Sequence, residues 1–484
     1  MIAIPTVFDT NDDTPPATAK EQLQQVAAYE NSLVQSVKGQ PNDPVSLGAY
    51  ADFLSCYPDR YSEALEMFER CLVCCCDKAD VRGELLPQYD LVYSTYVSLY
   101  ATFLSSMVTA DEGNGERACT LYEKALEKSQ GHPLALGDLA TFLHRHKKAY
   151  REAEAAYEQH LKDHPGHASI WAKYGNFLKS VKRDMKAAAR AFKTGVKVGP
   201  RNVEALTAYA VFLHGSTGDF ELAETMYQRA FEADPLHVNN LSNFGLFLSE
   251  CKEEFKRAET MYQKAMACDP THANSAYNYA VLLDSGMKDQ ARAEEMYRKC
   301  LEANANHAFA LYNLAVLVEE VRGSTDEGKR EAEMLFVAAI EASPRDAVTM
   351  ADYGRFKLVC LKDTKGAEEL LKRSLAIDRA CVVACYNLGM IELVHNKRKD
   401  EAKKLFSTAL EVEGGHVESL RYMARIYVAE GKKKEAEAML VRALENAKDE
   451  RANISKELEE LRRGGGGSGS GSGSAGVGRR RGSR

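Results

Sequence analysis

Apolar residues recur at intervals of three and four along most of the chain, in segments that come in pairs. In the stretch 273–307 the two segments carry, in order, Ala276, Tyr279, Ala280, Leu282 and Leu283, and then Ala293, Met296, Tyr297, Cys300 and Leu301. This spacing places the apolar side chains on one face of an amphipathic helix. The pattern predicts two antiparallel helices joined by a turn at Gly286, each needing a neighbour to cover its apolar face.

The same pair repeats along the chain in steps of 35 residues, except for one step of 39 after Ala315 and longer steps before Ala140. A small residue marks the first helix of each copy at Ala51, Ala101, Ala140, Gly175, Ala210, Gly245, Ala280, Ala315, Gly354, Gly389 and Ala424. A second small residue marks the second helix at Ala64, Ala118, Ala153, Ala188, Ala223, Ala258, Ala293, Ala332, Ala367, Ala402 and Ala436. A period of this length indicates a solenoid in which each pair packs on its neighbours, and the marks predict eleven helix pairs.

The residues around these marks resemble the tetratricopeptide repeat. The only Trp, Trp171, lies four residues before Gly175, where that family has its Trp, and an aromatic residue such as Tyr227 or Tyr262 follows the second small residue by four. Asp234-Pro235 and Asp269-Pro270 close their repeats. The resemblance covers about residues 45–447 and implies an all-α fold, a right-handed superhelical solenoid of antiparallel pairs. The usual period is about 34 residues, and we expect the additional residue in the turn within each pair.

This pattern divides the chain into five segments. We expect residues 1–17 to be disordered, 18–40 to form an N-terminal half-repeat helix, 45–447 to form the array, 449–463 to form a capping helix, and 464–484 to be a flexible Gly/Ser/Arg tail. The second and eighth pairs have four additional residues, at 109–116 and 322–330, which predict longer loops.

Composition and charge limit the cellular compartments and the classes of partner that we expect. The chain has 484 residues and a net charge of −7, and its tail is basic, so residues 1–463 are more acidic than the whole. This balance argues against nucleic-acid binding through the repeat body. No secretion signal and no apolar run of about 18 residues is present. Twelve cysteines without scaffold spacing indicate a reducing compartment, which we expect to be the cytoplasm, with the nucleus or the cilium as alternatives.

Asparagine recurs on the face of the first helices that is turned away from the repeat core. The positions two and six residues before the small residue carry Asn239, Asn243, Asn274, Asn278, Asn313 and Asn387. A carboxamide both donates and accepts hydrogen bonds, so regularly spaced asparagines suit the backbone of an extended peptide. The set resembles the asparagine ladder in the repeat array of O-GlcNAc transferases. The alternative is that these side chains only support local hydrogen bonds.

A second candidate site binds anions. Arg355, Arg421 and Arg425 are expected near Asn387 at the C-terminal end of the groove, where they could hold a carboxylate or a phosphate. The set partly resembles the carboxylate clamp of chaperone-binding relatives, but Ala351 stands where that clamp has a Lys. A solvated charged surface is the alternative interpretation.

The sequence contains no motif for catalysis or for a metal site. Cys71 and Cys300 occupy a position at which other repeats carry Ala, which indicates core packing, and no cofactor or metal is expected. Six histidines share one register in the turns between pairs and are interpreted as turn residues: His132, His167, His237, His272, His307 and His416. Ser483 follows two arginines and a glycine in a pattern that resembles a kinase site.

These features predict a non-enzymatic scaffold or adaptor that binds an extended segment of another protein in its inner groove. The alternative is a substrate-recognition or targeting subunit of an enzyme complex, for example one associated with a glycosyltransferase. A third interpretation is self-association through the exposed end repeats.

Overall fold

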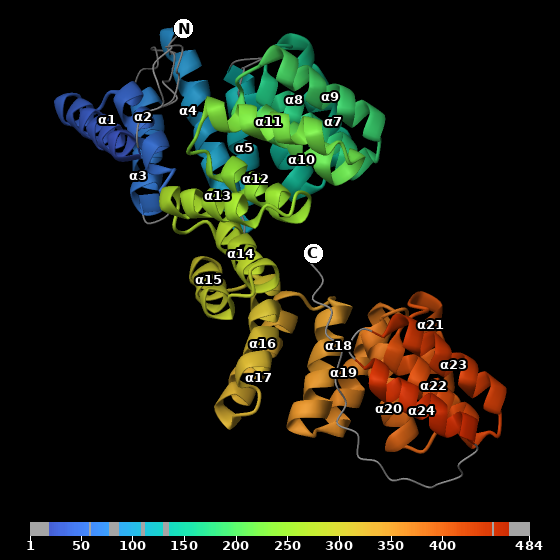
Figure 1. The fold of residues 1–484 in the computed structure, drawn as a ribbon. Coiled ribbons are helices and arrows are strands. Elements are labelled where there is room, and N and C mark those ends of the chain that lie inside the picture. Colours follow the sequence, from blue (N-terminus) through green and yellow to red (C-terminus); the bar gives the residue numbers. More distant parts are fainter. Residues whose placement is uncertain are drawn as a thin grey trace. The chain divides into compact units, whose positions relative to one another are not determined.

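The computed structural model describes residues 19–57, 60–76, 87–107, 112–128, 135–447 and 450–463, which form helices and turns and contain no strand (Figure 1). The chain divides into two compact units, Met1–Cys268 and Asp269–Arg484. The first unit begins with α1 (Ala19–Gly39) and continues with six helix pairs. These are α2 (Pro44–Leu54) with α3 (Tyr61–Cys76), α4 (Pro87–Ser106) with α5 (Glu112–Lys128), α6 (Ala135–Phe142) with α7 (Tyr150–Asp163), α8 (Ala168–Phe177) with α9 (Met185–Val198), α10 (Val203–Phe212) with α11 (Phe220–Ala233), and α12 (Val238–Glu250) with α13 (Phe255–Cys268).

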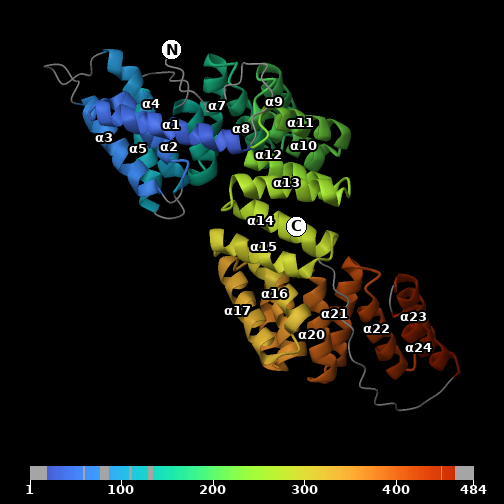
Figure 2. The same cartoon turned by 60° about the vertical axis from the view of Figure 1, so that its left-hand side comes forward.

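The second unit contains five pairs and a final helix (Figure 2). The pairs are α14 (Ala273–Val281) with α15 (Gln290–Ala303), α16 (Ala308–Arg322) with α17 (Asp326–Ala342), α18 (Ala347–Phe356) with α19 (Thr364–Ile377), α20 (Val382–Val394) with α21 (Lys399–Val412), and α22 (Val417–Ala429) with α23 (Lys433–Asn446). The chain then forms α24 (Arg451–Arg463). Over the described residues, the predicted all-α architecture of eleven helix pairs is confirmed.

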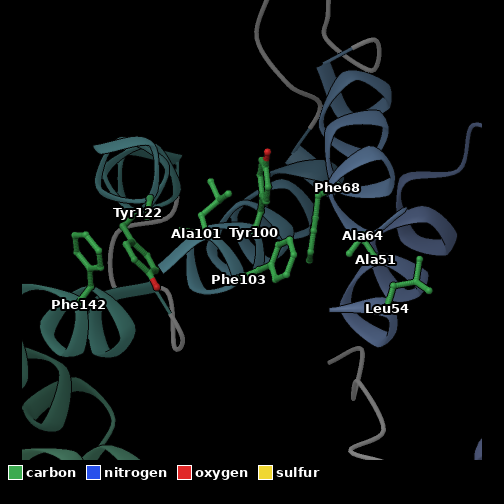
Figure 3. Packing of buried hydrophobic residues seen from close by; sticks show 11 residues of the cluster. Ala51, Leu54, Ala64, Phe68, Tyr100, Ala101, Phe103, Tyr122 and Phe142 are labelled. Carbon is green, nitrogen blue, oxygen red and sulfur yellow. The ribbon is translucent and has the colours of Figure 1, made fainter. Parts of the chain in front are cut away.

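Each pair closes around its small residues and one large side chain. The small residue of every second helix is fully buried. The residue four positions later, which is aromatic in nine pairs and Leu371 or Leu440 in the other two, packs against the first helix. Figure 3 shows that these rings also contact the next pair: the rings of Phe68 in α3 and Tyr100 in α4 stack with centroids 5.2 Å apart, and Tyr122 in α5 faces Phe142 in α6. The core is therefore a series of local clusters along the chain.

Glycine marks the closest contacts between the paired helices. A Cβ atom at Gly175 would lie 2.8 Å from the ring of Phe192, and one at Gly389 would lie 2.8 Å from the ring of Phe406. Contacts that short do not occur, so the ring occupies the space that a side chain would need. Elsewhere alanine takes this place, as Ala280 does in α14.

The additional residue of the 35-residue period lies where each first helix ends. Five first helices end in a π-helical turn, at Leu143–Lys147, Leu178–Lys182, Leu213–Thr217, Leu282–Gly286 and Lys357–Leu361. In the turn after α8, Asp184 N donates to the carbonyl of Leu178, six residues earlier, at 3.1 Å. A Schellman closure would span five residues. The wider closure accommodates one more residue without changing the packing of the pair.

The last pair supports this explanation because it lacks the additional residue. Ala424 and Ala436 are one residue closer in sequence than Gly389 and Ala402 are in the preceding pair. In the last pair Lys432 N donates to the carbonyl of Tyr427, five residues earlier, at 2.9 Å. The predicted position of the additional residue, in the turn within the pair, is confirmed.

Eight of the described turns within pairs pass through a residue in the left-handed region, and most of these residues are not glycine. They are Lys148, Arg183, Glu253, Lys288, Lys362 and Lys397, with φ between 54° and 59°, whereas Gly218 and Gly431 serve two other turns. A side chain in this region costs about 1–2 kcal/mol. We expect Lys288→Gly to raise the free energy of unfolding by about 0.5–1 kcal/mol in urea titrations. Gly218→Ala is the matched control and should lower the free energy of unfolding. A lower free energy of unfolding in both variants would contradict the left-handed conformation of Lys288.

The longer eighth pair does not form the predicted loop. Its four additional residues lengthen the helices: α16 extends to Arg322 and α17 begins at Asp326. Thr325 caps α17 by accepting a hydrogen bond from Gly328 N at 3.0 Å. In the second pair α5 already begins at Glu112, so the loop prediction is wrong there too for the described residues. An additional turn of helix satisfies its own backbone groups, which a loop of the same length would not.

Candidate peptide-binding surface

The asparagine register lies partly exposed and partly buried on the first helices. In the second unit it is occupied by Asn278, Asn313, Asp352, Asn387 and Tyr422. Asn278 and Asn313 are half-buried, whereas Asn387 is 5% exposed. Asn274, one helical turn before Asn278, is exposed. Within this unit the accessible asparagines of the register therefore lie on α14 and α16.

Asn313 is held in place by an aromatic cluster. Its Nδ2 atom donates to the Tyr277 hydroxyl at 3.2 Å, which links α16 to α14. The Tyr277 ring lies 4.8 Å from the ring of His307 and 6.3 Å from that of Phe309. Phe309 is 44% exposed. The arrangement places an oriented carboxamide beside an accessible aromatic ring.

The sequence reasoning did not single out Tyr277 or Phe309. Phe309 lies six residues before Ala315, at one of the positions expected to face a ligand, so its position could have identified it. Tyr277 lies one residue before Asn278, where nothing in the spacing distinguishes a hydrogen-bonding hydroxyl from a packed ring.

A buried ion-pair network replaces the ladder on α18. Arg355 is 5% exposed, and its two terminal nitrogens donate to the Glu319 carboxylate at 2.8 and 2.6 Å. Asp352, at the asparagine register, accepts from the Tyr312 hydroxyl at 2.7 Å and from Arg355 Nε at 3.4 Å. These bonds join α16 to α18.

The electrostatics of this network follow from its burial. Burial raises the pKa of Asp352 above its ordinary value, and the nearby Arg355 only partly offsets this. Burial disfavours the charged form of Arg355, but its bonds to Glu319 and Asp352 outweigh that effect and raise its pKa. The donors of Arg355 are thus used inside the protein, and the anion-binding prediction for this residue is wrong.

The other two predicted anion-binding arginines pair with the last helix. Arg421 donates to both Glu450 and Glu457, the latter at 2.7 Å, and Arg425 donates to Glu457 at 2.9 Å. The bonds from both arginines lower the pKa of Glu457 although its burial acts in the opposite direction. Arg421 and Arg425 do converge, as predicted, but on a carboxylate of α24 that belongs to this chain.

Two members of the asparagine set bond to their own helix. Asn387 Nδ2 donates to the carbonyl of Val383 at 2.8 Å, and Asn243 Nδ2 donates to that of Asn239 at 2.7 Å. Asn239 and Asn243 lie in the first unit, where Asn239 is exposed. Asn387 and Asn243 thus match the local hydrogen-bonding alternative.

The turn histidines have a more specific role than the sequence indicated. His237, His272, His307 and His416 begin first helices, and each accepts a hydrogen bond at Nδ1 from the backbone three residues later. Burial lowers the pKa of His272 and His307, which favours the neutral ring that this cap requires. His167 bonds instead to His160, with Nδ1 and Nε2 2.8 Å apart. His132 lies outside the described residues.

Three cysteines at core positions of the repeat behave as core residues. Cys71, Cys300 and Cys385 are buried. Burial raises the pKa of the Cys300 thiol to about 12 and that of Cys385 to about 11, so both are unreactive thiols at neutral pH. In the described ranges no three His, Cys, Asp or Glu side chains gather as metal ligands would. Ser483 lies outside the described residues.

None of the described helices has both the length and the apolar composition needed to cross a bilayer.

The comparisons with known proteins concern the repeats. Tetratricopeptide repeat family models match residues 182–238, 261–295 and 393–456. The sequence matches no curated protein. Among solved structures, the human IFIT1 dimer with PPP-AAAA has 18% identity and a TM-score of 0.47 and covers 75% of this chain and 94% of that chain. The APC/C hetero-tetramer Cut9-Hcn1 has 12% identity and a TM-score of 0.48, covering 91% and 94%. Yeast Tom70 has 13% identity and a TM-score of 0.41, covering 87% and 96%. Stretches that match tetratricopeptide repeat models thus lie in both compact units.

Proposed function

We propose that this chain is a non-enzymatic adaptor that binds an extended peptide on the first-helix surface of its second unit. This surface, which we call the α14/α16 surface, consists of Asn274, Asn278, Val281, Phe309 and Asn313. The observation that carries the proposal is the amide of Asn313, held by Tyr277 beside the exposed ring of Phe309. Tetratricopeptide repeats support a role in protein interactions in general.

The chemistry of the α14/α16 surface suits a peptide backbone. Asn278 and Asn313 lie at the same register in consecutive repeats, and each carboxamide can exchange hydrogen bonds with a main-chain N–H and C=O. Phe309 and Val281 offer apolar area to the side chains of the bound segment. A hydroxyl-bonded Asn313 loses less side-chain entropy on binding than a mobile one. No cofactor takes part in this function.

The proposal uses three asparagines of the predicted set, Asn274, Asn278 and Asn313. It leaves out Asn243, which lies in the first unit, and Asn387, which is 5% exposed. Asn274 is exposed and adds a contact one turn from Asn278. The α14/α16 surface spans only two repeats, so the peptide segment that it binds is expected to be correspondingly short.

The test is peptide selection followed by affinity measurement. Short unstructured peptides would be selected on the full chain from a displayed random library, and the best binder would be titrated by calorimetry. We expect Asn278→Ala and Asn313→Ala each to weaken binding about three- to tenfold, because each removes hydrogen bonds worth about 0.5–1.5 kcal/mol. Melting temperatures should change little, because both positions are half-exposed.

Asn306→Ala is the matched control. Asn306 is exposed in the turn between α15 and α16, and only its backbone N–H is bonded, to Asn304. This variant should bind the selected peptide as tightly as the unmodified chain. Equal affinities for all three variants would move the binding surface away from α14 and α16.

A further inference from the structure

A continuous basic stripe runs along the outer face of α9. Lys186, Arg190, Lys193 and Lys197 are separated by four, three and four residues, which places all four on one face of the helix. All four side chains are exposed. At a rise of about 1.5 Å per residue the stripe is about 16 Å long.

The structure gives this stripe no compensating charge. Helix α9 contains no acidic residue, and in the part of the chain that the structure describes none of the four side chains forms an ion pair. Lys182, in the turn before α9, differs because it pairs with Glu154 of α7 at 2.9 Å. Like charges four residues apart destabilise a helix slightly. The stripe therefore slightly destabilises the helix, and no side chain among the described residues forms an ion pair with it.

The repeat itself does not require basic residues here. At the same four positions α7 carries Arg151, Ala155, Glu158 and Lys162; α11 carries Glu221, Thr225, Gln228 and Glu232; and α13 carries Lys256, Thr260, Gln263 and Ala267. Other second helices of the first unit thus mix charges and small residues where α9 is uniformly basic. The difference indicates a ligand specific to this helix.

The neighbouring helix limits the width of that ligand. Arg229 of α11 donates to the carbonyl of Pro200, in the turn between α9 and α10, at 2.9 Å, so the C-terminal part of α11 lies beside the turn that follows α9. Glu232 is exposed in this part of α11. A duplex or an anionic membrane surface that covered the stripe would be wide enough to meet this carboxylate as well, which disfavours both.

A single nucleic-acid strand is narrow enough but lacks the contacts it needs. Strands of this kind bind basic grooves in which aromatic rings stack on the bases. The aromatic residue of α9, Phe192, is 1% exposed and faces the core. The stripe offers charge without a stacking surface.

We propose that the α9 stripe docks an acidic helix of a partner protein, with carboxylates at the same spacing of four, three and four residues. Ala189 and Thr194, which flank the stripe, are small, so the partner backbone can approach closely. Met185 and Val198 are exposed at the two ends of α9 and supply apolar contacts there. This site is in the first unit and does not depend on the α14/α16 surface.

The proposal is tested with a helical peptide as the probe. The peptide is alanine-based, carries Glu at the stated spacing and a fluorophore, and is titrated with the full chain by fluorescence anisotropy. A second peptide has Lys in place of each Glu. We expect the Glu peptide to bind the chain, and its affinity to fall as salt is raised because exposed charges are screened. The Lys peptide should not bind. The stripe variant combines Lys186→Glu, Arg190→Glu, Lys193→Glu and Lys197→Glu.

The stripe variant should lose about tenfold or more in affinity for the Glu peptide and gain binding of the Lys peptide. A control with the same change in net charge on exposed residues of the second unit should keep the original preference: Lys362→Glu, Lys365→Glu, Arg373→Glu and Arg379→Glu. Circular dichroism would confirm that both variants are folded. The proposal would be overturned if the Glu peptide did not bind or if both variants lost affinity equally. It would also be overturned if single-stranded RNA or phosphatidylserine vesicles, and not the Glu peptide, bound in a way that depends on the stripe.

Discussion

Replacing Arg355 by Met should lower the free energy of unfolding of the second unit by about 3–5 kcal/mol, because it leaves the buried Glu319 carboxylate without its cation. Arg355 makes two short bonds to Glu319 and a longer one to Asp352. Methionine fills similar volume, so the loss reports the missing charge and not a cavity. Urea unfolding followed by circular dichroism measures it.

The pH dependence identifies the cause of the loss. Burial raises the pKa of Asp352 in the folded state, and removal of Arg355, whose charge lowers that pKa, raises it further. A group with a raised folded-state pKa contributes stability that is lost as pH rises, so the deficit of Arg355→Met should be smaller at mildly acidic than at alkaline pH. Removing both charges, as Arg355→Met with Glu319→Leu, should recover most of the stability.

An exposed arginine provides the comparison. Arg425, which pairs with Glu457 on the surface, should lose at most about 1 kcal/mol when replaced by Met. If Arg355→Met proved as mild as Arg425→Met, the network between α16 and α18 would not be the buried ion pair described above.

Phe192→Ala should lower the free energy of unfolding of the first unit by about 3–5 kcal/mol. The ring is 1% exposed, lies 5.0 Å from the ring of Phe212 and occupies the space left by Gly175. Alanine would leave a cavity among three helices, which close-packed neighbours fill only in part. The urea midpoint of the full chain, followed by circular dichroism, checks this expectation.

The matched control for Phe192→Ala is Phe220→Ala. Phe220 begins α11 and is exposed, although its ring lies 6.3 Å from that of Phe247. This variant should lose about 1 kcal/mol or less. Similar losses in the two variants would mean that the close contact between Gly175 and Phe192 does not determine the stability of the pair.

The periodic part of the fold could be predicted because its causes are local. A small residue every 35 positions, an aromatic residue at a fixed offset and the turn between them recur in the sequence, so the pairs and the place of the additional residue followed. The lengthened helices α16 and α17 did not follow, since an insertion can enter a loop or a helix and the choice depends on hydrogen bonds that the spacing does not show.

The candidate site was harder to predict because hydrogen-bond partners come from neighbouring repeats. Asn313 and Asn387 share a register, yet one bonds to Tyr277 in the preceding repeat and the other to its own helix. The partners Arg355 and Glu319 are 36 residues apart and occupy different registers of their helices. By contrast, the spacing of the basic residues on α9 can be read from the sequence. The net charge of −7 is an average over the chain and gave no indication of this local basic surface.

The buried ion pair between α16 and α18 also bears on how such a chain finds its order. Because neighbouring repeats are so alike, a misassembled stack in which one pair is skipped keeps most of its apolar contacts. Skipping α18 and α19 would set Met390, which occupies the register of Arg355, against Glu319. A buried carboxylate facing a thioether is destabilised by several kcal/mol. A stack in which this pair is skipped is therefore less stable at this junction than the native order.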